Sequence, residues 1–157
     1  MEQTKLIVEI LFYIISSIAF IITVFTYTNS IKIKKAEWLS SLSEKFYQNN
    51  HYKDIRRILD YPEKNPDFDK LKLAINRVIN NEYILDSKEI SLLEEFVNFL
   101  NFFELMGTLE QLGQLKYNEI RLMFDYYLQL LKSMDNVESF LKHEGFKFTL
   151  SLTNRKI

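Results

Sequence analysis

The fold is decided by residues 10–31, which read ILFYIISSIAFIITVFTYTNSI and contain no Asp, Glu, Lys or Arg. The hydrocarbon core of a bilayer is about 30 Å thick, and a helix needs roughly 20 apolar residues to cross it. Hydroxyl side chains are tolerated in such a helix because they can bond to a backbone carbonyl one turn earlier. The run therefore predicts one transmembrane helix.

Two other interpretations of the run compete with this one. A core helix of a water-soluble protein usually has a polar face with a 3.6-residue period, and residues 10–31 lack charge on every face. A cleaved signal peptide has a positive N-terminal region, a shorter apolar centre and a small-residue cleavage site. The preceding residues, MEQTKLIVE, contain Lys5 against Glu2 and Glu9, and no Ala-x-Ala site follows the run. We therefore expect a retained anchor.

The charges that flank the run predict its orientation. Lys32, Lys34 and Lys35 follow it closely, whereas Lys5 alone precedes it. Lys and Arg are retained on the cytoplasmic side of a membrane. We therefore expect a short extracytoplasmic N-terminus at residues 1–9, with the rest of the chain in the cytoplasm.

The composition of the remaining chain predicts one helical domain over residues 32–144. Basic and acidic residues are equally numerous after the run, which argues against a nucleic-acid partner because such binding depends on neutralising phosphates. The whole chain has only 3 Gly and 2 Pro, so few residues interrupt helices. The predicted fold class is all-α, with one N-terminal transmembrane helix followed by a cytoplasmic helical bundle.

Apolar residues recur at helical spacing along this domain. Residues 37–49 read as a continuation of the membrane helix, a second stripe ends near Pro62, and a third breaks at Asn80. Asp86-Ser-Lys-Glu89 has the pattern of a capping box, in which side chains at a helix start satisfy free backbone N–H groups. The following helix, residues 90–109, is apolar nearly all round, which predicts that it forms the core of the domain.

The end of the chain carries weaker signals. Gly113 indicates a helix stop, residues 120–131 predict an antiparallel partner for the central helix, and residues 136–143 predict a short last helix. Apolar and polar residues then alternate with the period of a strand. Because one strand has no partner here, we expect residues 145–157 to form an extended or frayed tail, with pairing to another chain as the alternative.

No motif for metal, cofactor or covalent catalysis stands out. The chain has 2 His and no Cys, and none of its glycines opens a phosphate-binding loop. The sequence therefore predicts no catalytic residue, no metal and no cofactor.

Two polar groups are candidate contacts for a partner or ligand. Asn98, Asn101 and Glu104 follow one strip of the central helix, where a carboxylate could bind a cation or a partner's Arg. The alternative is a hydrogen-bonded strip that holds neighbouring helices in register, in which case Glu104→Gln should be nearly neutral.

The second group lies early in the second helix. Paired arginines suit carboxylates or phosphates, although nearby acidic residues could pair with them on a solvated face. This group contains His51, Asp54, Arg56 and Arg57.

Four segments carry a resemblance: AEWLSSLSEKFY, DIRRILD, LLEEFVNFLNFFELMGTLEQLG and IRLMFDYYLQLL. Together they resemble a family of short bacterial single-pass membrane-anchored helical proteins of unknown function, over roughly residues 8–143. That family has no established catalytic residues, so the resemblance assigns no site. It implies a phage-related or defence role only by association with accessory bacterial DNA.

These observations favour a non-catalytic, membrane-tethered module that senses or recruits a protein partner. The first alternative is a membrane-perturbing effector, whose copies associate through the small side chains of Ser16, Ala19 and Thr23. The second alternative is an enzyme with an unrecognised helical active site near Glu104.

Overall fold

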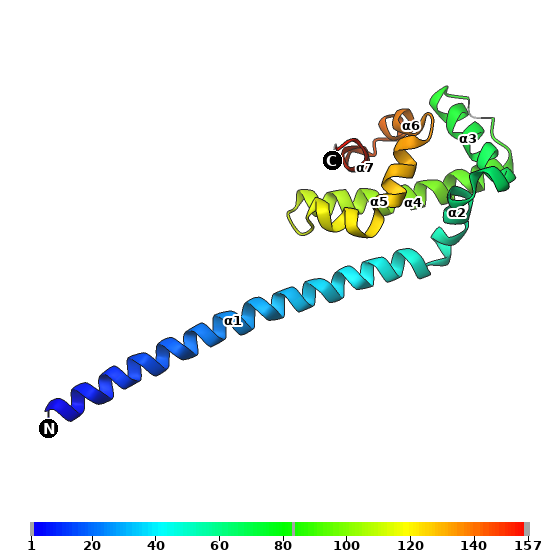
Figure 1. Cartoon of the computed structure of the whole chain (residues 1–157). Coiled ribbons are helices and arrows are strands. Elements are labelled where there is room, and N and C mark those ends of the chain that lie inside the picture. Colours follow the sequence, from blue (N-terminus) through cyan, green and yellow to red (C-terminus); the bar gives the residue numbers. More distant parts are fainter. Residues whose placement is uncertain (1, 83, 156–157) are drawn as a thin grey trace. The chain divides into compact units, whose positions relative to one another are not determined.

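The computed structural model describes residues 2–82 and 84–155, except for the side chains of Glu2, Thr4, Leu6, Val8 and His51. Within these residues the chain is all-helical, as predicted (Figure 1). It separates into two compact units, Met1–Glu44 and Lys45–Ile157.

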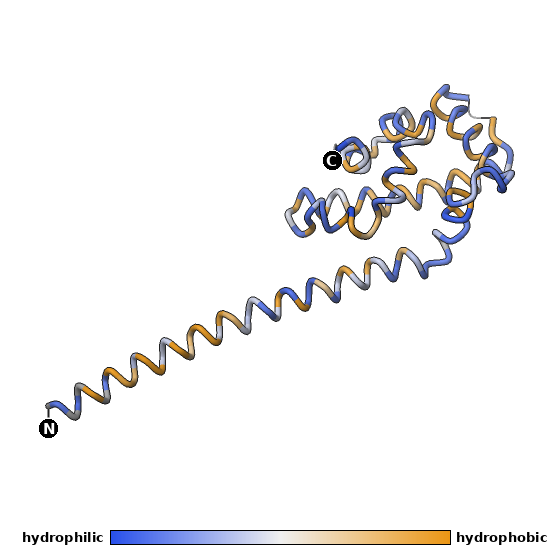
Figure 2. Tube along the Cα trace, in the orientation of Figure 1, coloured by the Kyte–Doolittle hydropathy of each residue, from blue (hydrophilic) through white to orange (hydrophobic). Residues whose placement is uncertain are grey.

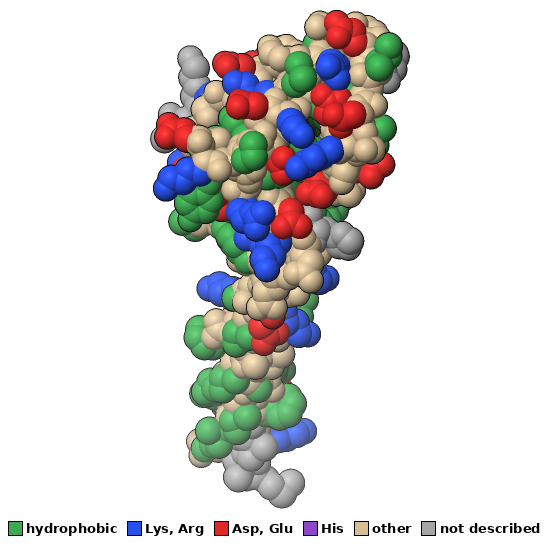
Figure 3. Space-filling view, turned by 90° about the vertical axis from the view of Figure 1, so that its right-hand side faces the viewer, with side chains coloured by type: hydrophobic (Ala, Val, Ile, Leu, Met, Phe, Trp, Pro, Cys, Tyr) green, Lys and Arg blue, Asp and Glu red, His purple; other side chains and the backbone are tan. Residues whose placement is uncertain are grey.

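The first unit is the greater part of helix α1, Glu2–Gln48, which continues without a break past the uncharged run, as predicted. Residues 10–28 are all exposed, so this part of α1 is not a buried core helix. Figure 2 shows its apolar residues clustered toward the N-terminus, and Figure 3 shows apolar side chains on its surface. By length and composition, α1 is suited to cross a membrane.

The second unit begins with the last turn of α1 and contains the other helices. These are α2 (Asn50–Asp60), the short 3-10 turn η1 (Pro62–Lys64), α3 (Pro66–Ile79), α4 (Ser87–Gln111), α5 (Tyr117–Ser133), α6 (Val137–Glu144) and α7 (Lys147–Asn154). The helices predicted from the stripe that ends near Pro62, from the stripe that breaks at Asn80, and over residues 90–109, 120–131 and 136–143 are thus confirmed.

Helix α4 is the centre of the second unit, as its apolar composition predicts. It contacts α2, α3 and α7, and Phe96, Leu100 and Phe103 on it are fully buried. Its N-terminus has the predicted capping box, with Asp86 accepting the backbone N–H of Glu89 and Glu89 accepting that of Asp86. Local chemistry at this end therefore fixes where α4 begins.

An aromatic cluster joins the elements of this unit. Phe46, in the last turn of α1, is completely buried, and its ring centroid lies 4.7 Å from that of Phe102 and 4.9 Å from that of Phe124. The rings of Phe102 on α4 and Phe124 on α5 lie 5.2 Å apart, so side chains of these two helices meet in the cluster. The backbone of α7 approaches α4 more closely than that of α5 does.

The prediction of an extended tail after residue 144 is wrong. Gly145, with φ of +81°, ends α6, and α7 follows at once. Phe146, Thr149, Leu152 and Thr153 are buried, at the spacing of a helix. Two of these four buried residues are threonines, which a search for apolar residues passes over. The apolar residues of the segment therefore alternate with the two-residue period of a strand, although the segment is a helix.

Candidate functional site

Glu104 is the candidate residue with the clearest role. Its half-buried carboxylate accepts the backbone N–H of Phe148 at 3.1 Å and that of Thr149 at 2.8 Å. The hydroxyl of Thr149 donates to the same carboxylate at 2.9 Å. These two N–H groups belong to the first turn of α7, where helical N–H groups have no partner within the helix. Glu104 therefore caps α7 from a different helix.

This cap agrees with the second interpretation of the polar strip at Glu104, a hydrogen bond that holds neighbouring helices in register. A carboxylate at a helix N-terminus is also favoured by the helix dipole, so the geometry fits a bond that holds α4 and α7 together. Asn98 and Asn101, by contrast, are exposed. The predicted strip is therefore divided between one structural carboxylate and two solvent-facing amides.

Arg56 also bonds to the protein itself. Its Nη2 donates to the carbonyl of Tyr47 at 2.7 Å and its Nε to that of Tyr52 at 3.2 Å. Its guanidinium lies 5.3 Å from the ring centroid of Tyr47 and 5.5 Å from that of Phe46. Since Tyr47 is in the last turn of α1, Arg56 satisfies a carbonyl that the helix end leaves free.

The predicted arginine patch is thus separated into two parts. Arg56 is half-buried and bound to the end of α1, while Arg57 and Asp54 are exposed. The side chain of His51 lies outside the described part of the structure. Of the patch members whose side chains the structure describes, Arg57 and Asp54 are on the surface, as the sequence suggests.

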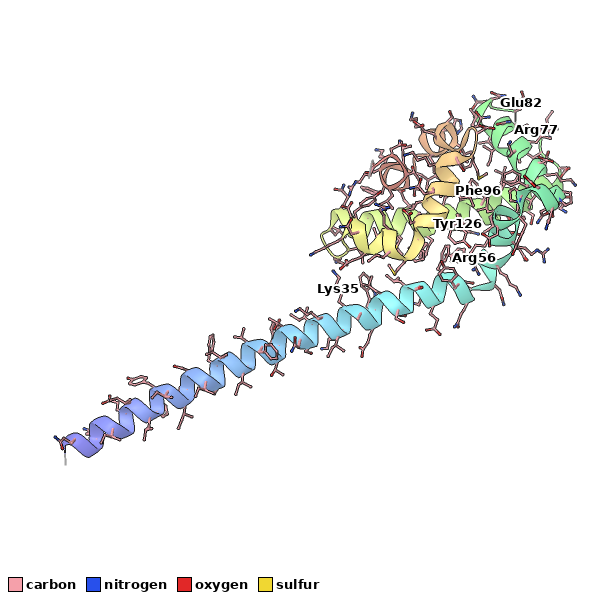
Figure 4. All side chains as sticks on the ribbon, viewed as in Figure 1. Lys35, Arg56, Arg77, Glu82, Phe96 and Tyr126 are labelled. Carbon is pink, nitrogen blue, oxygen red and sulfur yellow. The ribbon has the colours of Figure 1, made fainter. Side chains whose placement is uncertain are left out.

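A tyrosine–carboxylate group was not found by sequence reasoning. The hydroxyl of Tyr127 on α5 donates to Oδ2 of Asp60 on α2 at 3.4 Å, and Oδ1 of Asp60 is buried without a partner among the described residues. Burial, and then the charge of Asp60, raises the pKa of Tyr127 to about 12. Burial also raises the pKa of Tyr126, which is labelled in Figure 4. The phenol of Tyr127 is therefore a neutral hydrogen-bond donor at physiological pH.

Glu95 is the second acidic group that the sequence did not single out. It is half-buried on α4, and its Oε2 is buried without a hydrogen-bond partner in the described chain. Burial raises the pKa of Glu95, and the charges of Asp54 and Asp67 raise it further. Among the residues that the structure describes, no group of three or more His, Asp or Glu is arranged to hold a metal ion.

Two ion pairs fasten helix ends to α4. Arg77 near the end of α3, labelled in Figure 4, donates to both oxygens of Glu89 at 2.9 and 2.7 Å. Arg155 donates through two nitrogens to Glu110 at 2.9 and 3.0 Å and covers the ring of Tyr117. Their partners are far apart in sequence, so residue spacing gives no signal for them. Both pairs stabilise helix packing.

Helix α5 carries a surface hollow of about 580 Å³, lined by Asn118, Arg121, Leu122 and Asp125. Arg121 donates to Asp125 at 2.9 Å, and Leu122 is 88% exposed. All four residues lie within two turns of one helix. The hollow is therefore a depression on a helix surface, without the converging groups of a nucleophile and a base.

Comparisons of the chain with protein-family models, with curated proteins and with solved structures found no match. Over residues 2–82 and 84–155 the structure is all-helical, with one helix long and apolar enough to cross a membrane and a second unit that has its own core.

Proposed function

We propose that this chain is a membrane-tethered, non-catalytic interaction or sensing module. The observation that carries the proposal is the uncharged run at residues 10–31, exposed over residues 10–28, on the same chain as a helical unit with its own core. Exposed apolar surface of this extent is stable in lipid and unstable in water. A tether also keeps the unit close to the bilayer and raises its effective concentration for neighbouring proteins.

Flanking charge supports an orientation with the second unit in the cytoplasm. Lys32, Lys34 and Lys35 follow the span, and the rule for retained positive charge applies to such short flanks. The N-terminus would then lie outside.

The contacts of the candidate residues support a non-catalytic role. Glu104 caps α7, and Arg56 binds carbonyls at the end of α1 and in α2. These side chains hold helices together.

Two hydroxyls of the span, those of Ser17 and Thr23, need no second copy for their hydrogen bonds. Ser17 donates to the carbonyl of Tyr13 and Thr23 to that of Ala19, each at 2.8 Å. A single span therefore satisfies these groups within its own helix. This favours a tether over an effector assembled in the membrane.

Cysteine labelling tests the tether and its orientation, because the chain has no natural cysteine. Gln3→Cys and Gln114→Cys place single thiols at exposed positions on either side of the span. In intact cells a membrane-impermeant maleimide should label Gln3→Cys alone, and after lysis it should label both. Labelling of Gln114→Cys alone in intact cells would reverse the orientation, and loss of both from the membrane fraction would exclude a retained anchor.

Exchange of the span separates the tether from the effector. Residues 10–31 are replaced by an unrelated monomeric membrane helix, and proteins near the second unit are identified by proximity labelling in cells. If the span is only a tether, the exchanged chain should label the same neighbouring proteins as the native chain. Depolarisation of cells by the native chain that disappears with Ser16→Leu and Thr23→Leu would instead support the effector.

A further inference from the structure

The surface hollow on α5 has the geometry of a socket for one side chain of a facing helix. Its lining residues, Asn118, Arg121, Leu122 and Asp125, are spaced i, i+3, i+4 and i+7, so they lie on one face of the helix. Four residues of one helix form the hole that receives an apolar side chain where two helices pack. The hollow is therefore shaped for a helix as its partner.

This face of α5 is turned away from the side that packs in the second unit. Ile120, Phe124 and Leu128 are buried on the packed side, whereas Leu122 is 88% exposed and Tyr126, labelled in Figure 4, is 56% exposed. A single exposed leucine is common on protein surfaces. The position of Leu122 is what distinguishes it, because it lines the hollow. A copy of the same face would offer both an apolar side chain and a hollow beside it.

The polar residues of the hollow make the face complementary to itself. Asn118 and Asp125 are about two turns apart, so they lie on one line along α5. Arg121 donates to Oδ1 of Asp125 at 2.9 Å, and this half-exposed carboxylate can accept a further donor at its other oxygen. In an antiparallel pair of identical helices, the Asn118 amide of each copy would lie opposite the Asp125 carboxylate of the other. A parallel pair would instead oppose the two Asp125 carboxylates, which repel each other.

We propose that α5 pairs antiparallel with α5 of a second copy of this chain, with Leu122 of each copy beside the hollow of the other. An interface of one helix from each copy is smaller than that of a standard stable complex. This inference therefore rests on the proposed function, because the tether raises the effective concentration of the copies for one another. The pairing lies outside the span, so it differs from an effector whose copies associate within the membrane.

Disulfide crosslinking of the full chain in isolated membranes tests the pairing, because the chain has no natural cysteine. Asn118→Cys and Asp125→Cys are produced in the same cells with different tags, and the membranes are mildly oxidised. The mixture should give a crosslink between the two variants, a pair in which the second Asn118–Asp125 contact stays intact. Each variant alone should give none, because identical positions would lie about 10 Å apart along the helix axis. A disulfide bridges Cα atoms up to a separation of about 7 Å.

Substitution of Leu122 tests its place in the pair. Copies labelled at Gln114→Cys, an exposed position, are reconstituted in vesicles, and energy transfer between the labels measures their association. Leu122→Lys should lower the transfer to that of copies mixed at random, because it puts a charge on each copy where the two leucines would meet. The matched control is Ile84→Lys, at an apolar residue that is 90% exposed in the loop between α3 and α4, and it should retain the transfer.

An exchange of the two polar residues tests the antiparallel register. Asn118→Asp should reduce the energy transfer, because it opposes a second carboxylate to Asp125 of the other copy. Addition of Asp125→Asn to the same chain restores one amide opposite one carboxylate, so the transfer should recover. A role of either residue in the fold of its own chain would not produce this recovery.

Two kinds of result would overturn the proposal in different ways. Crosslinking of either cysteine variant with itself, or energy transfer that survives Leu122→Lys, would exclude the antiparallel pair. Absence of both the mixed crosslink and the energy transfer, with the chain still in the membrane fraction, would exclude pairing while leaving the tether intact. Recovery of the chain in the soluble fraction would refute the proposed function, and the pairing that depends on the tether would fail with it.

Discussion

The carboxylate of Glu104 supplies what the sequence of α7 lacks. Phe146, the residue that precedes α7, has no side chain able to accept a hydrogen bond, and the structure shows no side-chain cap from it. Glu104 provides two carboxylate oxygens for three donors instead, all on Phe148 and Thr149. The conformation of residues 147–154 therefore depends on a residue in another helix.

Glu104→Gln should destabilise the second unit, in contrast to the neutral effect expected from a generic polar strip. An amide offers one acceptor oxygen and faces the remaining N–H with its own donor, which costs about 1–3 kcal/mol when a half-buried group loses its partner. Thermal unfolding of the full chain and hydrogen exchange at Phe148 and Thr149 measure the loss. Glu94→Gln, at an exposed position of α4, is the control. Equal melting of the two variants would contradict the cap.

Because of Glu95, the free energy of unfolding should be larger in mild acid than at neutral pH. Its pKa is raised in the folded protein, first by burial and then by Asp54 and Asp67. The folded state therefore holds the proton more tightly than the unfolded state does. This contribution is complete below the unfolded pKa of a Glu and is lost as the pH rises through the folded value.

Glu95→Gln should remove this contribution, because the amide keeps the shape and cannot ionise. The variant should be more stable than the native chain at neutral pH, and its advantage should shrink toward acid pH. Denaturant midpoints across this range, compared with those of the exposed control Glu94→Gln, measure the difference. An advantage that does not change with pH would show that ionisation of Glu95 is not its source.

At the scale of elements, the close contact of α4 with α7 depends on a glycine. A Cβ at Gly107 would lie 2.5 Å from the Cβ of Phe148 and 3.1 Å from its carbonyl carbon and oxygen. Backbone atoms cannot move aside as a flexible side chain can. The absence of a side chain at this position therefore permits the observed approach of the two helices.

Gly107→Ala should separate α7 from α4 and lower stability. Alanine favours a helix by about 1 kcal/mol over glycine, but an inserted methyl group in a packed interface typically costs about 1–3 kcal/mol, and here its neighbour is backbone. Thermal unfolding and faster hydrogen exchange across α7 measure the effect. Asn101→Ala, on the exposed side of the same helix, should be neutral or stabilising. A rise in melting temperature for Gly107→Ala would contradict the steric argument.

Elements whose determinants are local could be predicted from the sequence, and elements fixed by distant residues could not. Helix α4 has a continuous apolar stretch and its own capping box, so its limits are readable. Helix α7 has threonines at two buried positions and takes its cap from Glu104, so it reads as a strand or a tail. The hydrogen bond from Tyr127 to Asp60 joins two helices that only the fold brings together.

At the scale of the whole molecule, the boundary between the two units falls inside one helix. The sequence places the domain boundary where the uncharged run ends, near residue 31, whereas the compact units meet between Glu44 and Lys45. Charge marks the limit of the span, but packing marks the limit of the folded unit. Only the limit of the folded unit depends on contacts made by residues distant in sequence.

Two phenylalanines of α1 should therefore respond differently to the same substitution. Phe46→Ala should destabilise the second unit by about 3–5 kcal/mol, because it leaves a cavity at the centre of the aromatic cluster. Phe20→Ala, at a position that is 70% exposed in the first unit, should leave the unfolding of the second unit unchanged. Chemical unfolding of the full chain in lipid nanodiscs, followed by near-ultraviolet circular dichroism, compares them. Equal loss of stability in both variants would contradict the division into units.

The position of Phe46 also has a consequence for biosynthesis. The ribosome releases the span and Phe46 early, whereas Phe102 and Phe124, whose rings pack against Phe46, are synthesised much later. The aromatic core cannot close until α5 has left the exit tunnel. Under the proposed function, membrane insertion should thus precede folding, so that the nascent second unit completes its fold while already attached to the bilayer.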